Sequence, residues 1–212
     1  MKQNVFLYRT LCGICKPLLK IFFPYKVKGK ENINKHDGGY IVCSNHLSNF
    51  DAVFLAIELN EPICFMAKDQ LFKNKLLGWI LSAIGTFPVE RGKDNGKAIE
   101  MAKNVIEENK VLGIFLEGTR SKTGEFLRPR SGVSVLAYST GASVLPVCIT
   151  GKNGGRIKIF KRTTVTFGKM IDIDELNMNN GSLSEFRNSS RLIMNRIKSL
   201  REEDTELKGI KE

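Results

Sequence analysis

Several signatures that would assign a function directly are missing from this sequence. No Gly-x-Ser-x-Gly stretch occurs, so no serine nucleophile on a strand-to-helix elbow is expected. Cys12 and Cys15 form a Cys-x-x-Cys pair, but no second Cys or His pair follows at zinc spacing, which argues against a metal site. Residues 92–98 place three residues between two glycines where a P-loop has four, and Ala98 stands where a hydroxyl is required, so nucleotide hydrolysis is not supported.

Aromatic residues are also scarce, at 8% of the chain, and they do not alternate with the Lys and Arg clusters. That pattern disfavours a nucleic-acid-binding protein. The five cysteines are an odd number in apolar contexts, which indicates reduced thiols in a cytosol. What is present is enough hydrophobic sequence, 42% of 212 residues, for one compact core, and a net charge of +11. This charge predicts an anionic partner, namely a nucleic acid, an acidic membrane surface, or an acidic protein or phosphate-rich acyl donor.

The first 27 residues are expected to form a helical segment that lies on a membrane surface. Apolar side chains surround a stripe of cations spaced by seven, seven and four residues: Lys2, Arg9, Lys16 and Lys20. These cations argue against a membrane-spanning helix, no cleavage site marks a signal peptide, and Pro17 is expected to kink or end the helix. Residues 71–84, which include the only tryptophan, suit either a second membrane contact or an ordinary core helix.

Over residues 28–212, apolar runs alternate with helical patterns. Strands are expected at residues 40–43, 85–89, 111–116 and 144–147, and helices near residues 51–57, 95–108, 133–141 and 183–200. Residues 156–160 and 163–167 resemble a hairpin, and a charged tail is expected from Asp204. The alternation predicts a single α/β domain with a largely parallel central sheet flanked by helices.

His46 and Asp51 follow the first of these strands directly. Residues five apart on a regular helix are rotated by roughly 140°, so both cannot lie mid-helix and face each other. We therefore expect His46 in a turn, Ser48 or Asn49 as the N-cap, and Asp51 in the first helical turn. A carboxylate that accepts a hydrogen bond from one imidazole nitrogen leaves the other free to take a proton. The simpler alternative is that Asp51 only caps the helix.

A second polar turn, Glu117-Gly118-Thr119-Arg120, follows the strand at residues 111–116. In alternating α/β sheets, the turns at the carboxyl ends of the strands line the ligand site. A glycine, a hydroxyl and a guanidinium in one turn suit an anionic oxygen group.

Four blocks in this order resemble the glycerolipid acyltransferase family. They are His-x4-Asp at residues 46–51, a Phe-x-x-x-Arg segment from Phe87 to Arg91, Glu-Gly-Thr-Arg at residues 117–120, and a proline-centred strand at residues 144–147. After the third block many members carry Lys-x-Gly, where this sequence reads Arg130-Ser131-Gly132 and retains the positive charge.

The resemblance implies a reaction. His46, held by Asp51, would deprotonate the 2-hydroxyl of lysophosphatidate, and the oxygen would attack an acyl thioester to give phosphatidate for phospholipid synthesis. The residues implied to bind substrate, mainly the acceptor phosphate, are Lys68, Arg91, Glu117, Gly118, Thr119 and Arg120. Glu117 would either brace its loop or contact substrate hydroxyls.

The resemblance further implies neither metal nor cofactor, with acyl-coenzyme A or acyl-acyl carrier protein as co-substrate. The enzyme would work at the cytoplasmic face of the cell membrane, on an anionic bilayer and without nucleic acid. Three alternatives stay open: the same chemistry on glycerol 3-phosphate or another lysolipid, a basic protein that only binds membranes or nucleic acid, and a membrane scaffold with an inactive site.

Overall fold

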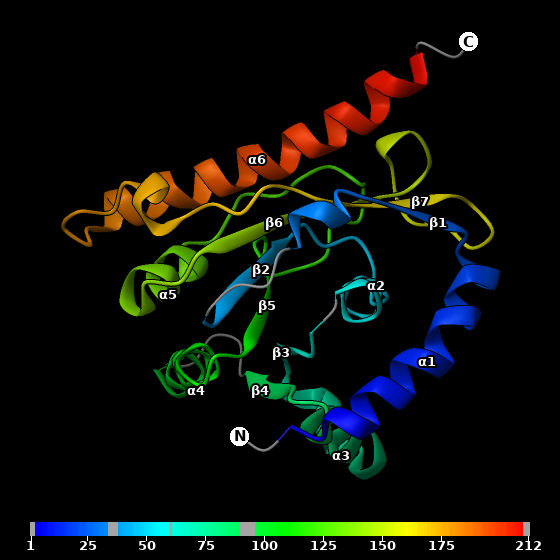
Figure 1. Cartoon of the computed structure of the whole chain (residues 1–212), viewed down its shortest axis with the longest axis horizontal. Coiled ribbons are helices and arrows are strands. Elements are labelled where there is room, and N and C mark those ends of the chain that lie inside the picture. The colour runs from blue at the N-terminus through cyan, green and yellow to red at the C-terminus, as the bar shows by residue number, and fades with distance from the viewer. Residues whose placement is uncertain (1–2, 34–37, 60, 90–95, 210–212) are drawn as a thin grey trace.

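The computed structural model describes residues 3–33, 38–59, 61–89 and 96–209. Within these ranges, seven strands form one sheet in the order β1-β7-β6-β2-β5-β3-β4 (Figure 1). Strands β6, β2, β5, β3 and β4 run parallel, whereas β7 is antiparallel to β6 and β1 runs with β7. The largely parallel α/β sheet is therefore confirmed. The strands are β1 (Tyr25–Lys28), β2 (Tyr40–Ser44), β3 (Ile63–Lys68), β4 (Phe87–Val89), β5 (Val111–Phe115), β6 (Val144–Thr150) and β7 (Thr163–Phe167).

Helices cover both faces of the sheet. Alternate residues of β2 face opposite sides, with Tyr40 and Val42 packing toward α1 and α2, and Ile41 and Cys43 toward α4, α5 and α6. All five residues of β2 are buried, as a central parallel strand requires. The helices are α1 (Val5–Phe22), α2 (Asp51–Glu58), α3 (Lys75–Ala83), α4 (Gly96–Glu107), α5 (Gly132–Thr140) and α6 (Leu183–Gly209), with 3₁₀ helices at Lys30–Asn32, Asp69–Lys73, Lys152–Gly154 and Ile173–Leu176.

The N-terminal helix α1 continues through Pro17 and packs against the rest of the domain. Pro17 lies inside α1 and does not end it, because Tyr8 and Leu19 are buried on either side of the proline and hold both halves of the helix. Lys16 forms an ion pair with the buried Glu58 of α2, at 3.1 Å, and is not simply solvated. The expected boundary after residue 27 falls inside β1, so α1 leads directly into the sheet. No helix among the described residues has the length and apolarity needed to cross a bilayer.

Two further expectations need correction. Residues 156–160 form a loop and not a strand, because β7 pairs with β6 on one side and with β1 on the other. The charged tail is instead the end of α6, where Asp204 is buried and forms an ion pair with Lys28 of β1. Of the two alternatives left open for residues 71–84, the structure disfavours the core helix, because in α3 only Gly78 is buried, while Leu76 and Trp79 are 70% and 62% exposed.

Candidate active site

The carboxyl ends of β2, β5 and β3 bring three sequence motifs to one edge of the sheet. These strands are parallel neighbours, so His46 after β2, the turn at residues 117–120 after β5, and Lys68 at the end of β3 lie at the same edge. Arg91 follows β4 in sequence but lies outside the described residues. The topology therefore assembles residues that are more than seventy positions apart in the chain.

His46 and Asp51 are in direct contact. The imidazole Nδ1 lies 2.7 Å from Asp51 Oδ2, and the same oxygen accepts hydrogen bonds from the backbone N–H groups of Leu47 and Ser48, at 2.6 and 2.8 Å. Asp51 is fully buried, and its Oδ1 has no hydrogen-bond partner among the described residues. Because Nδ1 is occupied by the carboxylate, Nε2 is the nitrogen left to meet a substrate.

The helix cap differs from the expected one. α2 begins at Asp51 with Phe50 as the N-cap, so neither Ser48 nor Asn49 takes that position. The Ser48 hydroxyl instead accepts a hydrogen bond from Phe50 N, at 3.2 Å, within the turn that precedes the helix. The carboxylate of Asp51 points back into this turn, and it therefore organises the histidine loop as well as starting the helix.

Two residues that the sequence did not single out fix the histidine. Phe115, the last residue of β5, stacks on the His46 ring with centroids 3.9 Å apart and planes 9° apart. Asn45 pairs its amide with the backbone of Ile149 in β6, accepting from N at 2.8 Å and donating to O at 2.9 Å. Asn45 follows β2 directly and stands between Ser44 and His46, so no local pattern in the sequence indicated this cross-strand contact.

Glu117 connects the two motif loops. Its side chain is 2% exposed, Oε1 accepts a hydrogen bond from His46 N at 3.3 Å, and Oε2 accepts one from Leu127 N at 3.2 Å. Burial raises the pKa of this carboxyl group above its ordinary value, and the two backbone hydrogen bonds partly oppose that change. Of the two roles expected for Glu117, these contacts support bracing of the loop. Ser121 N adds a second link by donating to His46 O, at 2.8 Å.

The rest of the turn is open to solvent. Gly118 has φ +65°, a conformation that favours glycine, and Thr119 and Arg120 are exposed. Lys68 is also exposed, and neither Lys68 nor Arg120 has a carboxylate partner among the described residues. Both cations lie at the sheet edge that holds His46 and are available for an anionic ligand group.

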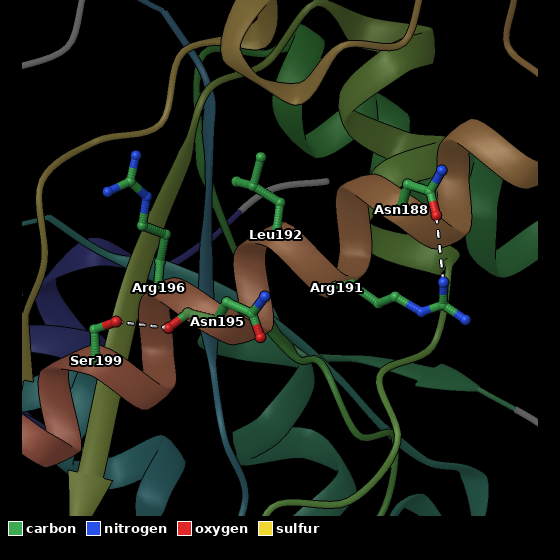
Figure 2. A pocket seen from close by; sticks show the side chains of 6 residues that line it. All are labelled: Asn188, Arg191, Leu192, Asn195, Arg196 and Ser199. Carbon is green, nitrogen blue, oxygen red and sulfur yellow. Dashed lines mark hydrogen bonds between the residues drawn. The ribbon is translucent and has the colours of Figure 1, made fainter.

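No other part of the described structure offers a rival site with the same chemistry. Figure 2 shows a pocket whose six lining residues all come from α6 and not from strand ends. Its Arg191 donates a hydrogen bond to Asn188 on the same helix, at 3.3 Å. Within the described ranges, no three His, Cys, Asp or Glu side chains gather as metal ligands would. The histidine loop is thus the place where chemistry is best supported.

Comparison with known proteins agrees with this architecture. Residues 24–150, which include the whole histidine loop and the turn after β5, match the family model described as Acyltransferase. The chain belongs to the acyltransferase family. Within that family it is 30% identical over 157 residues to a 1-acyl-sn-glycerol-3-phosphate acyltransferase of Bacillus subtilis, an alignment that covers 74% of this chain and 77% of the relative.

Two more comparisons place this acyltransferase among its relatives. A Streptococcus pneumoniae protein of the same description is 28% identical, with 69% of this chain and 55% of that protein aligned. The crystal structure of a 1-acyl-sn-glycerophosphate acyltransferase from Thermotoga maritima has a TM-score of 0.74 and 24% identity, covering 94% of this chain and 80% of that one. The latter likeness establishes the shared fold of the acyltransferase.

Proposed function

We propose that this acyltransferase esterifies the 2-hydroxyl of lysophosphatidate with an acyl group from a thioester and so forms phosphatidate. The observation that carries this proposal is the 2.7 Å contact between His46 Nδ1 and Asp51 Oδ2 at the carboxyl edge of the sheet. The descriptions of the Bacillus and Streptococcus relatives support lysophosphatidate, a 1-acylglycerol 3-phosphate, as the acceptor.

In the proposed reaction, His46 acts as a general base. Nε2 takes the proton of the acceptor hydroxyl, and the oxygen attacks the thioester carbonyl carbon. The carbon–sulfur bond then breaks, the thiolate leaves, and the proton passes from Nε2 to the sulfur, so the histidine is neutral again. Asp51 holds the tautomer in which Nε2 carries no proton and stabilises the imidazolium that forms. The Phe115 ring restricts tilting of the imidazole.

The exposed cations would position the acceptor. Arg120 and Lys68 lie at the same sheet edge as His46, and Arg91 completes the proposed set from outside the described residues. The backbone N–H group of Thr119 adds a neutral donor, whereas that of Gly118 already donates to Phe115 O, at 2.9 Å. A charge-assisted hydrogen bond contributes on the order of 1.5–3 kcal/mol, so two or three of them would fix the phosphate and with it the hydroxyl.

The remaining partners follow from charge and from the nature of the acceptor. Either acyl-coenzyme A or acyl-acyl carrier protein would serve as donor, since both are anionic and the chain carries a net charge of +11. A lysophospholipid resides in a bilayer, so we propose that the enzyme works as a peripheral protein on the anionic cytoplasmic face of the cell membrane. Neither a metal nor a further cofactor takes part in the proposed steps.

An acyl-transfer assay with labelled lysophosphatidate and each thioester donor tests the proposal. His46→Ala is expected to abolish turnover, and Arg120→Ala is expected to raise the KM for lysophosphatidate by about ten-fold or more while changing the rate on monoacylglycerol little. Arg187→Ala, which removes an exposed arginine of α6, is the matched control and should behave like the unchanged protein. Full activity of His46→Ala would refute the assigned base.

The acceptor is tested in the same experiment. Glycerol 3-phosphate and other lysolipids are offered beside lysophosphatidate at equal concentration. The proposal expects lysophosphatidate to give the highest kcat/KM, and a preference for glycerol 3-phosphate would assign the same chemistry to a different acceptor. Binding to oligonucleotides in place of liposomes, without turnover, would contradict an enzymatic role.

A further inference from the structure

The loop between β6 and β7 ends in five consecutive exposed residues, in which two adjacent apolar side chains are flanked by cations. We call this segment the β6–β7 tip; it consists of Lys158, Ile159, Phe160, Lys161 and Arg162. Ile159 is 58% exposed and Phe160 is 65% exposed. Placing two large apolar side chains side by side in water is unfavourable, so a loop that does so is expected to have a partner.

The backbone of the tip is held in place. Phe160 has φ +58°, a left-handed conformation that a bulky side chain rarely adopts. Its N–H donates to the carbonyl oxygen of Phe22 at the end of α1, at 2.7 Å, and the two rings lie 6.0 Å apart. These contacts fix Phe160 in a strained conformation that keeps its ring largely exposed. Strain of this kind is found most often at functional positions.

The topology places the tip at the same edge of the sheet as the active site. β6 runs parallel to β2, so the loop that follows β6 leaves the sheet at the carboxyl edge, where His46 also lies. Phe22 is followed by Phe23, whose ring lies 4.7 Å from that of Phe50, the residue directly before Asp51. The end of α1 therefore contacts both the tip, through Phe22 and Phe160, and the histidine loop, through Phe23 and Phe50.

The exposed side of α1 extends this apolar surface. Figure 1 shows α1 running from a position beside α3 to the start of β1, close to the tip. Along it, Phe6, Ile14 and Ile21 are 82%, 57% and 61% exposed, and α3 adds Leu76 and Trp79 at the other end. Cations flank the apolar side chains at the tip, which matches an anionic lipid headgroup layer better than it matches a protein surface.

We infer that the β6–β7 tip inserts into an anionic phospholipid bilayer, with Ile159 and Phe160 entering the acyl boundary and Lys158, Lys161 and Arg162 contacting headgroup phosphates. Together with α1 it would form two sides of the same membrane-contact surface and keep the histidine loop at headgroup depth. The inference rests on the proposed function for the identity of the surface, a bilayer that holds the acceptor, and the insertion itself can be measured without turnover.

Vesicle flotation of the full chain tests the insertion. The combined variant Ile159→Ser, Phe160→Asn removes the apolar pair, and asparagine tolerates the left-handed backbone of Phe160. We expect its partitioning onto phosphatidylglycerol-containing vesicles to fall by at least about ten-fold. The control Leu183→Ser removes a side chain that is 71% exposed at the start of α6, and it should bind as the unchanged protein does. Equal binding of the combined variant and the unchanged protein would overturn the inference.

Two further measurements separate insertion from charge attraction. Neutralising the cations singly, as Lys158→Gln, Lys161→Gln or Arg162→Gln, should weaken binding to anionic vesicles by about five-fold each and leave binding to phosphatidylcholine vesicles unchanged. In a Trp79→Phe background, Phe160→Trp gives a single tryptophan at the tip, because the chain contains no other. Its fluorescence should be quenched by lipids brominated on the acyl chain, and a tryptophan that stays unquenched on bound vesicles would exclude insertion.

Failure of this inference and failure of the proposed function are distinguishable. If the chain binds vesicles through the tip but does not acylate lysophosphatidate, the proposed acceptor is wrong and the insertion stands. If the combined variant turns over a detergent-dispersed acceptor at the normal rate and also binds vesicles normally, the proposed function stands and the insertion is wrong.

Discussion

Replacing Asp51 by asparagine tests the orientation of the histidine most directly. The change keeps the shape of the side chain and removes the negative charge from Oδ2, which accepts hydrogen bonds from His46, Leu47 and Ser48. An asparagine can keep its oxygen at this position, where it attracts the imidazole more weakly. It can also turn its amide toward Nδ1, which would favour the tautomer with a proton on Nε2 and no base for the substrate.

The expected magnitude follows from these contacts. General-base catalysis contributes about 10²–10⁴-fold to a rate, and either orientation of the amide forfeits much of it, so kcat should fall by that order. Stability should change less. The substitution weakens three hydrogen bonds to a charged oxygen, which lowers stability. It also removes the cost of burying a negative charge whose Oδ1 has no partner among the described residues, and this partly offsets the loss.

The assay is steady-state acyl transfer to detergent-dispersed lysophosphatidate, beside thermal unfolding of each variant. The matched control is Glu58→Gln, which neutralises a buried carboxylate at the other end of α2. It should leave kcat within about three-fold, because the ion-pair partners of Glu58, Lys16 and Lys30, lie outside the histidine loop. A kcat for Asp51→Asn equal to that of the control would refute an orienting role for Asp51.

Three further predictions concern neighbouring groups. Phe115→Leu removes the ring stacked on His46 and should lower kcat by about three- to ten-fold at unchanged KM, as steady-state kinetics will report. Burial raises the pKa of Glu117, so its folded pKa exceeds the unfolded one. The stability that this group contributes is present below the ordinary value of 4.5 and is lost as the pH rises through the folded pKa. In urea unfolding, the free energy of unfolding of the unchanged protein should therefore rise relative to that of Glu117→Gln as the pH falls from neutral toward 4.5. For Glu58, burial raises the pKa, but hydrogen bonds from Lys30, Tyr25 and Lys16 outweigh burial and leave the pKa lowered. The stabilisation by Glu58 is present above the ordinary value of 4.5 and is lost as the pH falls through the folded pKa. The same urea unfolding in acid should therefore show no difference in stability between the unchanged protein and Glu58→Gln.

The parts of the fold that the sequence predicted correctly are those set by local pattern. The continuous apolar run at residues 40–43 indicated a buried parallel strand, and the polar turns after it and after β5 indicated a site at one sheet edge. The place of each strand in the sheet depends on distant residues, so local sequence does not predict it. Nothing near residues 163–167 distinguishes pairing with residues 156–160 from the observed pairing of β7 with β6 and β1.

The same distinction holds for the site. The spacing of His46 and Asp51 predicted their contact, because both residues belong to one loop and helix start. Phe115 and Asn45 were missed because their partners lie on other strands, and a phenylalanine ending a strand looks like any core residue. Asp204 was assigned to a tail for a similar reason, since its partner Lys28 lies at the opposite end of the chain.

The short helix α2 is fastened at both of its ends. Its first residue, Asp51, accepts hydrogen bonds from the histidine loop, and its last, Glu58, forms ion pairs with Lys16 of α1 and with Lys30, at 3.1 and 2.6 Å. Eight residues of helix span only about 12 Å and bend little. The helix consequently fixes the spacing between α1 and the carboxylate that holds the imidazole.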